Sequence, residues 1–220
     1  MDFEIILKFL KDLAKHNDRT WFEKNKSRYN AAKEGFEFFV AALLEEMIKF
    51  DDSLLGLNPK KLTFRIYRDV RFSKDKSPYK KNMSAAFSSA GKGLAVPGYY
   101  FHIEPGNKSM VGAGMFMPVP ENVAKIREEI DYNGDKLQKI FKDKKFNTNF
   151  ASFWDEDKLK TAPKGYAKDH PHVEWLKLKS FIVTHTFKDS EVTDKKFLKK
   201  VTAVMKSVKP LNDFLKEAIS

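Results

Sequence analysis

The sequence predicts an α+β fold, in which a mostly antiparallel β-sheet is flanked by N-terminal and C-terminal α-helices. Apolar residues recur at helical spacing near both ends of the chain. Between them, four consecutive segments alternate apolar and polar residues and are joined by short turns, which favours antiparallel pairing. Because 220 residues show neither an internal repeat nor a low-complexity linker, we expect a single domain over residues 1–220. Within it we expect a helical N-terminal region (residues 1–50), a core motif (residues 62–118) and a mixed C-terminal region (residues 119–220).

The first helices follow from apolar spacing and end signals. A helix is predicted over residues 3–15, and His16-Asn17-Asp18 should end it. Thr20 and Glu23 form a capping-box pattern that opens the next helix. That second helix is expected to continue to about residue 50, with a break near Gly35.

Strands and helices alternate less regularly in the rest of the chain. Strands are predicted at 62–67, 83–90, 98–104, 109–117 and 180–187. Helices are predicted at 120–131, 134–142, 171–178 and 193–219, with an irregular stretch over 144–169. Pro210 should kink or interrupt the last helix, because proline removes a backbone hydrogen bond.

Composition excludes several classes of protein. Hydrophobic residues make up 42% of the chain, enough for a core. The absence of cysteine excludes disulfides and thiolate metal sites. The N-terminus lacks a signal-peptide pattern, and no segment approaches the roughly 20 apolar residues that cross a bilayer. We therefore expect a soluble cytoplasmic protein without membrane association.

The net charge of +11 is distributed unevenly. Residues 60–81 carry nine basic and two acidic side chains, a net charge of +7, and include three arginines at a spacing of three. Guanidinium and ammonium groups suit phosphate and carboxylate. The candidate ligand-binding residues are Arg65, Tyr67, Arg68, Asp69, Arg71, Lys76, Tyr79 and Lys80. The alternative is structural: Arg68 would pair with a partly buried Asp69 and lock a loop to the sheet.

His102 and Glu104 are candidate catalytic residues. On the strand 98–104 they point to one face with Tyr100, so they could act as an acid/base pair or as two metal ligands. Alternatively, His102 could simply be hydrogen-bonded at the sheet surface. No further ligand stands at metal-binding spacing, so we predict no metal and no cofactor. If the strand 62–67 shares this face, Arg65 and Tyr67 complete a composite cleft.

Two glycine-containing segments resemble nucleotide-binding loops only superficially. Gly112-Ala113-Gly114 lies within a predicted strand, which indicates close backbone packing. Gly91-Lys92-Gly93 lacks the remaining features of a phosphate-binding loop.

Three functions remain open at this stage. The first is binding of an acidic or phosphorylated small molecule in a basic cleft, with or without catalysis. The second is nucleic-acid binding, which the pI of about 9.5 and the aromatic residues beside the basic segment would suit. The third is a structural or partner-binding module. The oligomeric state is also left open.

The order of motifs resembles a bacterial and fungal family catalogued as domain of unknown function 2461. The similarity covers nearly the whole chain and is centred on the segment Phe64–Lys80. Its other elements are Phe9-Leu10, His16-Asn17, Trp21-Phe22, Lys26, Tyr29, Gly98-Tyr99-Tyr100, Gly112-Ala113-Gly114, Pro163-Lys164-Gly165-Tyr166 and His170-Pro171. The resemblance implies a single family domain and no particular reaction, cofactor or catalytic residue.

Overall fold

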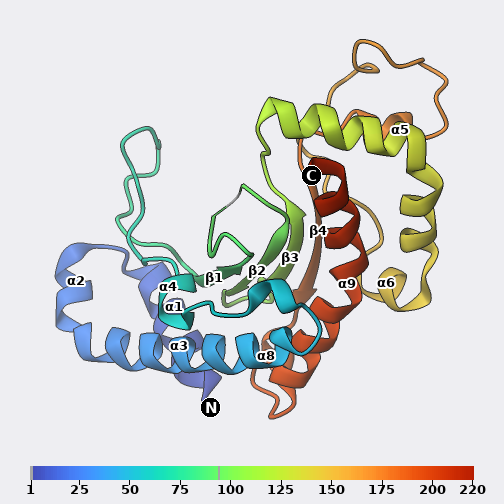
Figure 1. Cartoon of the computed structure of the whole chain (residues 1–220). Coiled ribbons are helices and arrows are strands. Elements are labelled where there is room, and N and C mark those ends of the chain that lie inside the picture. The colour runs from blue at the N-terminus through green and yellow to red at the C-terminus, as the bar shows by residue number, and fades with distance from the viewer. Residues whose placement is uncertain (1, 94) are drawn as a thin grey trace.

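The computed structural model describes residues 2–93 and 95–220. Its elements in chain order are α1 (Phe3–Lys15), α2 (Arg19–Lys24), α3 (Lys26–Ile48), the 3₁₀ turn η1 (Asp52–Leu54), α4 (Pro59–Leu62), β1 (Met83–Phe87), β2 (Gly98–Ile103), β3 (Ser109–Met115), α5 (Pro120–Lys142), α6 (Lys144–Asn149), α7 (Val173–Leu176), β4 (Phe181–Phe187), α8 (Asp189–Val192) and α9 (Phe197–Ile219). Figure 1 shows the helices around one curved sheet. No helix in the described ranges has the length and apolar content that a bilayer crossing requires.

The four strands form one antiparallel sheet in the order β1-β2-β3-β4. The register places Phe101 of β2 between Ala85 of β1 and Val111 of β3, and Val111 opposite His185 of β4. Three strands follow one another directly, whereas β4 arrives after the helices α5, α6 and α7. The predicted α+β class, with its antiparallel sheet and flanking helices, is confirmed.

One face of the sheet forms the core together with the longest helices. The ring of Phe101 lies 5.1 Å from that of Phe39 in α3 and 6.1 Å from that of Phe197 in α9. Helices α3 and α9 therefore cover the same face of β2 (Figure 1). Alternate residues of β2 reflect this arrangement: Tyr99 and Phe101 are buried, while Tyr100 between them is only partly buried. In the part of the chain that the structure describes, α3 and α9 leave the other face of the sheet, which carries Tyr100, uncovered (Figure 1).

The predicted strand over 62–67 is wrong. Pro59 begins the short helix α4, which Asn58 caps, and this helix ends at Leu62. The chain then touches β1 at a single bridge, between Thr63 and Ala85. Beyond it the backbone bonds to its own returning arm, so that the amide of Lys80 donates to the carbonyl of Ile66. The alternation that indicated a strand belongs to a hairpin arm, not to the sheet.

The helical predictions need smaller corrections. Asp18, not Thr20, caps α2, because its carboxylate accepts a hydrogen bond from the amide of Trp21. The break between helices falls at Asn25, and Gly35 lies within α3.

Two further differences lie in the C-terminal region. Helix α6 forms within the stretch predicted to be irregular, where Asp143 caps it. Helix α9 is not interrupted at Pro210, because buried residues on both sides of the proline, including Val208 and Leu211, hold it against the core. The two predicted helices 120–131 and 134–142 are the halves of α5, which is kinked at Asn133.

A buried carboxylate links the sheet to the helices. Asp51 is 3% exposed and accepts hydrogen bonds from the hydroxyls of Tyr99 (2.9 Å) and Ser53 (2.6 Å), with Lys216 of α9 at 3.6 Å. Burial by itself would raise the pKa of Asp51, but the hydrogen bonds and Lys216 outweigh it and hold the pKa below its ordinary value.

Asp51→Asn should cost about 1–3 kcal/mol of unfolding free energy near neutral pH, because the buried hydroxyl of Tyr99 loses its charged acceptor. Since the folded pKa of Asp51 is lowered, its contribution is present above the unfolded pKa of about 3.9 and is lost as pH falls through the folded value. Urea unfolding near pH 7 and near pH 3 should therefore show the difference from wild type shrinking in acid. A difference that does not depend on pH would contradict this account.

Two glycines of β3 offer a matched test of backbone packing. Gly114 has φ +113°, and a Cβ there would lie 2.0 Å from the carbonyl oxygen of Phe181. Gly112 has no unusual φ, and its nearest neighbours would lie at 3.8 Å. Gly114→Ala should cost at least about 2 kcal/mol, whereas Gly112→Ala should stay within about 1 kcal/mol of wild type. Denaturant unfolding of the two variants checks this, and equal costs would be inconsistent with it.

Candidate functional site

The basic segment forms a hairpin, defined here as residues 64–80, that projects from the rest of the chain (Figure 1). Its arms meet at the bridge between Tyr67 and Tyr79, and the amide of Arg68 donates to the carbonyl of Pro78. Tyr79 is buried and stacks on Phe22, with ring centroids 4.0 Å apart. Its backbone amide and carbonyl both bond to the side chain of Asn17. Tyr79 therefore anchors the hairpin to the N-terminal helices.

Arg68 holds the outer half of the hairpin together. Its guanidinium donates to the carboxylate of Asp75 (2.8 Å), the carbonyl of Ser77 (2.9 Å) and the hydroxyl of Ser73 (3.3 Å). Hydrogen bonds from Ser77 lower the pKa of Asp75 to about 2, and Arg68 contributes to this shift. The donors of Arg68 are thus used within the loop.

The other charged residues near the tip also have internal partners. Arg71 forms a two-pronged ion pair with Asp69, and the ammonium of Lys76 donates to the carbonyl of Val70. Both members of the Arg71–Asp69 pair are exposed, and hydrogen bonds from Arg71 hold the pKa of Asp69 below its ordinary value. The predicted pairing of Asp69 with Arg68, and its partial burial, are both wrong.

His102 and Glu104 contact different groups and not each other. His102 bonds through Nε2 to the carbonyl of Lys108 (2.6 Å) and through Nδ1 to the hydroxyl of Tyr100 (3.1 Å). Glu104 accepts a hydrogen bond from Asn82. Burial lowers the pKa of His102, which favours the neutral ring. The predicted composite cleft required 62–67 to be a strand of the same sheet as β2, and it is not a strand.

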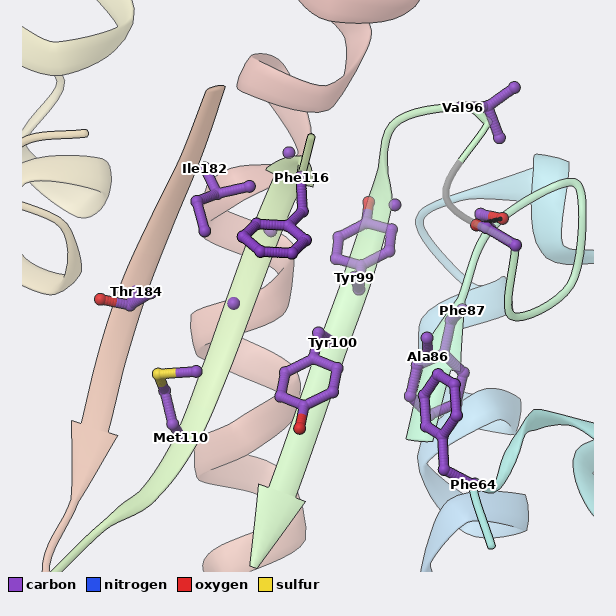
Figure 2. A pocket seen from close by; sticks show the side chains of 16 residues that line it. Phe64, Ala86, Phe87, Val96, Tyr99, Tyr100, Met110, Phe116, Ile182 and Thr184 are labelled. Atoms are coloured by element: carbon purple, nitrogen blue, oxygen red, sulfur yellow. Dashed lines mark hydrogen bonds between the residues drawn. The ribbon is translucent and has the colours of Figure 1, made fainter. Parts of the chain in front are cut away.

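A cavity of about 390 Å³ lies on the face of the sheet that the long helices leave open. Figure 2 shows Tyr100 of β2 between Met110 of β3 and Ala86 of β1, with Phe116 above them in the view. The lining residues among those that the structure describes are Phe64, Ala86, Phe87, Ser88, Gly93, Val96, Gly98, Tyr99, Tyr100, Met110, Gly112, Ala113, Gly114, Phe116, Ile182 and Thr184. This lining is overwhelmingly apolar, which is typical of small-molecule sites.

Glycine keeps the floor of the cavity open. Gly112 and Gly114 lie on β3 on the same face as Met110, where any other residue would project a side chain into the space. Position 114 requires glycine because of its positive φ and its close contact with the backbone of Phe181. This agrees with the close backbone packing predicted for Gly112-Ala113-Gly114. Gly112 has room for a side chain, so its substitution would fill the cavity without a backbone clash.

Cations gather at one end of this cavity, around Phe64. The ammonium of Lys80 lies 5.2 Å from the centre of the Phe64 ring and that of Lys92 lies 5.5 Å from it. Burial and the nearby charges of Arg65 and Lys92 lower the pKa of Lys80, so both of these cations lie close enough to Lys80 to repel its ammonium. In residues 2–93 and 95–220, none of the three forms an ion pair with a carboxylate. We call Arg65, Lys80 and Lys92 the basic rim.

The structure therefore divides the predicted ligand-binding residues. Arg65 and Lys80 lie together at the basic rim, whereas Arg68, Asp69, Arg71 and Lys76 are bound within the hairpin. Tyr79 is buried, and Tyr67, which pairs with it across the hairpin, is exposed. The sequence interpretation missed Lys92, whose ammonium donates to the carbonyl of Thr63. The cavity was missed as well. No local sequence signal marks Lys92, because it reaches Phe64 only where the connection between β1 and β2 folds back to the sheet edge.

Arg68→Ala should loosen the hairpin locally. The substitution removes three hydrogen bonds to residues 73–77, so amide hydrogen exchange over 69–77 should speed up. The melting temperature should fall by no more than about 4 °C, because Asp75 is left exposed to water rather than buried. Arg71→Ala, which removes the exposed pair with Asp69 and the contact with the exposed ring of Phe72, is the control and should change exchange less. Unchanged exchange in Arg68→Ala would refute the role given to this arginine.

Comparison with known proteins agrees with the motif resemblance. No curated protein and no solved structure matches the chain significantly. The model of the conserved hypothetical protein family DUF2461 matches residues 5–214, which includes the hairpin, all four strands and the basic rim. The chain therefore belongs to the conserved hypothetical protein family DUF2461.

Proposed function

We propose that this protein binds a small amphipathic anion, with the apolar portion of the ligand in the cavity and its acid group at the basic rim. The observation that carries the proposal is the basic rim itself: Lys80 and Lys92 lie against the ring of Phe64, which also lines the apolar cavity, and Arg65 lies near Lys80. None of the three cations has a carboxylate partner among the described residues. Clustered like charges oppose folding, and a bound anion would offset that cost.

The position of the basic rim supports a ligand with its acid group at one end. Phe64 lies beside β1, where the bridge between Thr63 and Ala85 brings the hairpin to the sheet edge. Lys92 reaches the same place from the connection between β1 and β2, through its bond to Thr63. A phosphate or a carboxylate suits this mixture of guanidinium and ammonium donors.

Calorimetric titration with two probes tests the proposal: decanoate, with an alkyl body, and anilinonaphthalene sulfonate, with an aromatic one. At least one should bind the wild type, and Lys80→Gln and Lys92→Gln should each weaken that binding about tenfold, the loss expected of a charge-assisted contact. Lys11→Gln, at an exposed position on α1, is the matched control and should bind like wild type. Neutral decanol should bind more weakly than decanoate.

The same variants separate binding from a purely structural role. Removing a cation from a repelling cluster should leave the unfolding free energy of Lys80→Gln unchanged or raised. A large loss of stability in this variant would favour the structural interpretation. If neither probe binds at about 1 mM, the proposal is wrong.

A further inference from the structure

We infer that the apolar portion of the ligand is a single unbranched acyl chain of about ten to twelve carbons, lying across the strands with its acid group at the basic rim. This inference rests on the proposed function and names its ligand class. Three properties of the cavity support it: its extent across the sheet, its few free hydrogen-bonding groups, and the confinement of charge to one end.

The cavity crosses the whole width of the sheet. Its lining includes Ala86 from β1, Tyr100 from β2, Gly112 from β3 and Thr184 from β4. Because neighbouring strands lie about 4.8 Å apart, the first and the last of these strands are separated by about 14 Å. In Figure 2 the labelled side chains accordingly extend from Phe64 on one side to Thr184 on the other. A ligand that fills this space is longer than it is wide.

Few polar side chains face the cavity with a free hydrogen-bonding group. The hydroxyl of Ser88 donates to the carbonyl of Gly91, and that of Tyr100 bonds to His102. The hydroxyl of Tyr99 lies on the core side of β2, where it donates to Asp51. Thr184 is the remaining hydroxyl among the described lining residues, at the far side of the sheet. A nucleobase or a sugar would bury several polar atoms here without partners, which is costly, whereas a hydrocarbon would not.

Charge is confined to the end near β1. Lys80 and Lys92 flank Phe64 there, while the opposite end is lined by Phe116 and Ile182. A ligand with an acid group at both ends would leave one of them against apolar side chains. At the roughly 30 Å³ that each water takes in the liquid, 390 Å³ holds about a dozen non-hydrogen atoms. That volume fits one medium-length chain and not the two chains of a phospholipid.

The test is a homologous series of linear carboxylates from about six to about sixteen carbons, titrated calorimetrically below their micelle concentrations. Affinity should rise about threefold to fourfold per methylene and level off at about ten to twelve carbons, where the cavity is full. Alkyl phosphates of the same lengths show whether the acid group is a carboxylate or a phosphate. A naphthalene carboxylate supplies the aromatic comparison and should bind more weakly than decanoate.

Two classes of variant separate the chain site from the acid site. Gly112→Leu, which places a side chain on the cavity floor, should move the levelling-off point to shorter chains. Gly112→Ala should do so to a smaller degree and keeps the test valid if the leucine variant fails to fold. Lys80→Gln should weaken every chain length by the same factor and leave the levelling-off point unchanged.

The outcomes distinguish this inference from the proposed function. Tighter binding of the aromatic acid than of decanoate, or an affinity that does not depend on chain length, overturns the acyl-chain inference and leaves the amphipathic-anion proposal standing. A levelling-off point that Gly112→Leu does not move also overturns it. Failure of every linear and aromatic acid to bind overturns both.

Discussion

The arrangement of this protein depends on a sheet that buries only one of its faces. Phe101, on the buried face of the sheet, packs on α3 and α9. This contact fixes which residues of each strand point away from the core. Tyr100, Met110 and Gly112 then fall on the open face by the two-residue period of the strands. The cavity is a consequence of that one-sided packing, made deeper by the glycines of β3.

The two groups of cations in the basic segment have opposite electrostatic situations. Arg68 and Arg71 direct their donors to Asp75 and Asp69 within the hairpin, which stabilises its shape and neutralises its charge. The basic rim has no such partners among the residues that the structure describes, and Arg65 and Lys92 both repel Lys80. Internal pairing in the hairpin weakens the case for nucleic-acid binding there, whereas the charges at the rim favour a small anion beside the cavity.

The sequence alone predicts the helices and strands in which buried residues recur at a regular spacing. It does not predict contacts that depend on the path of a turn or a connection. The core helices and the strands near 83–90, 98–104 and 109–117 have one consistently apolar face, so the spacing of their apolar residues predicts them. The segment 62–67 alternates apolar and polar residues in the same way, but the backbone there bonds to the returning arm near residues 78–80. The alternation alone cannot distinguish such a hairpin arm from a strand of the sheet. Lys92 reaches Phe64 only because a connection folds back to the sheet edge, and no local pattern encodes that contact.

The most direct measurement for the central claim is a map of amide chemical shifts by nuclear magnetic resonance during titration with decanoate. The account predicts that the largest changes fall at the cavity floor and the connection beside it, at Gly98, Gly112 and Gly93. It predicts little change at the exposed hairpin tip around Phe72, whose side chain is 97% exposed and lies outside the cavity lining. Changes confined to the hairpin tip would contradict the account and would indicate that the ligand binds at the basic hairpin instead.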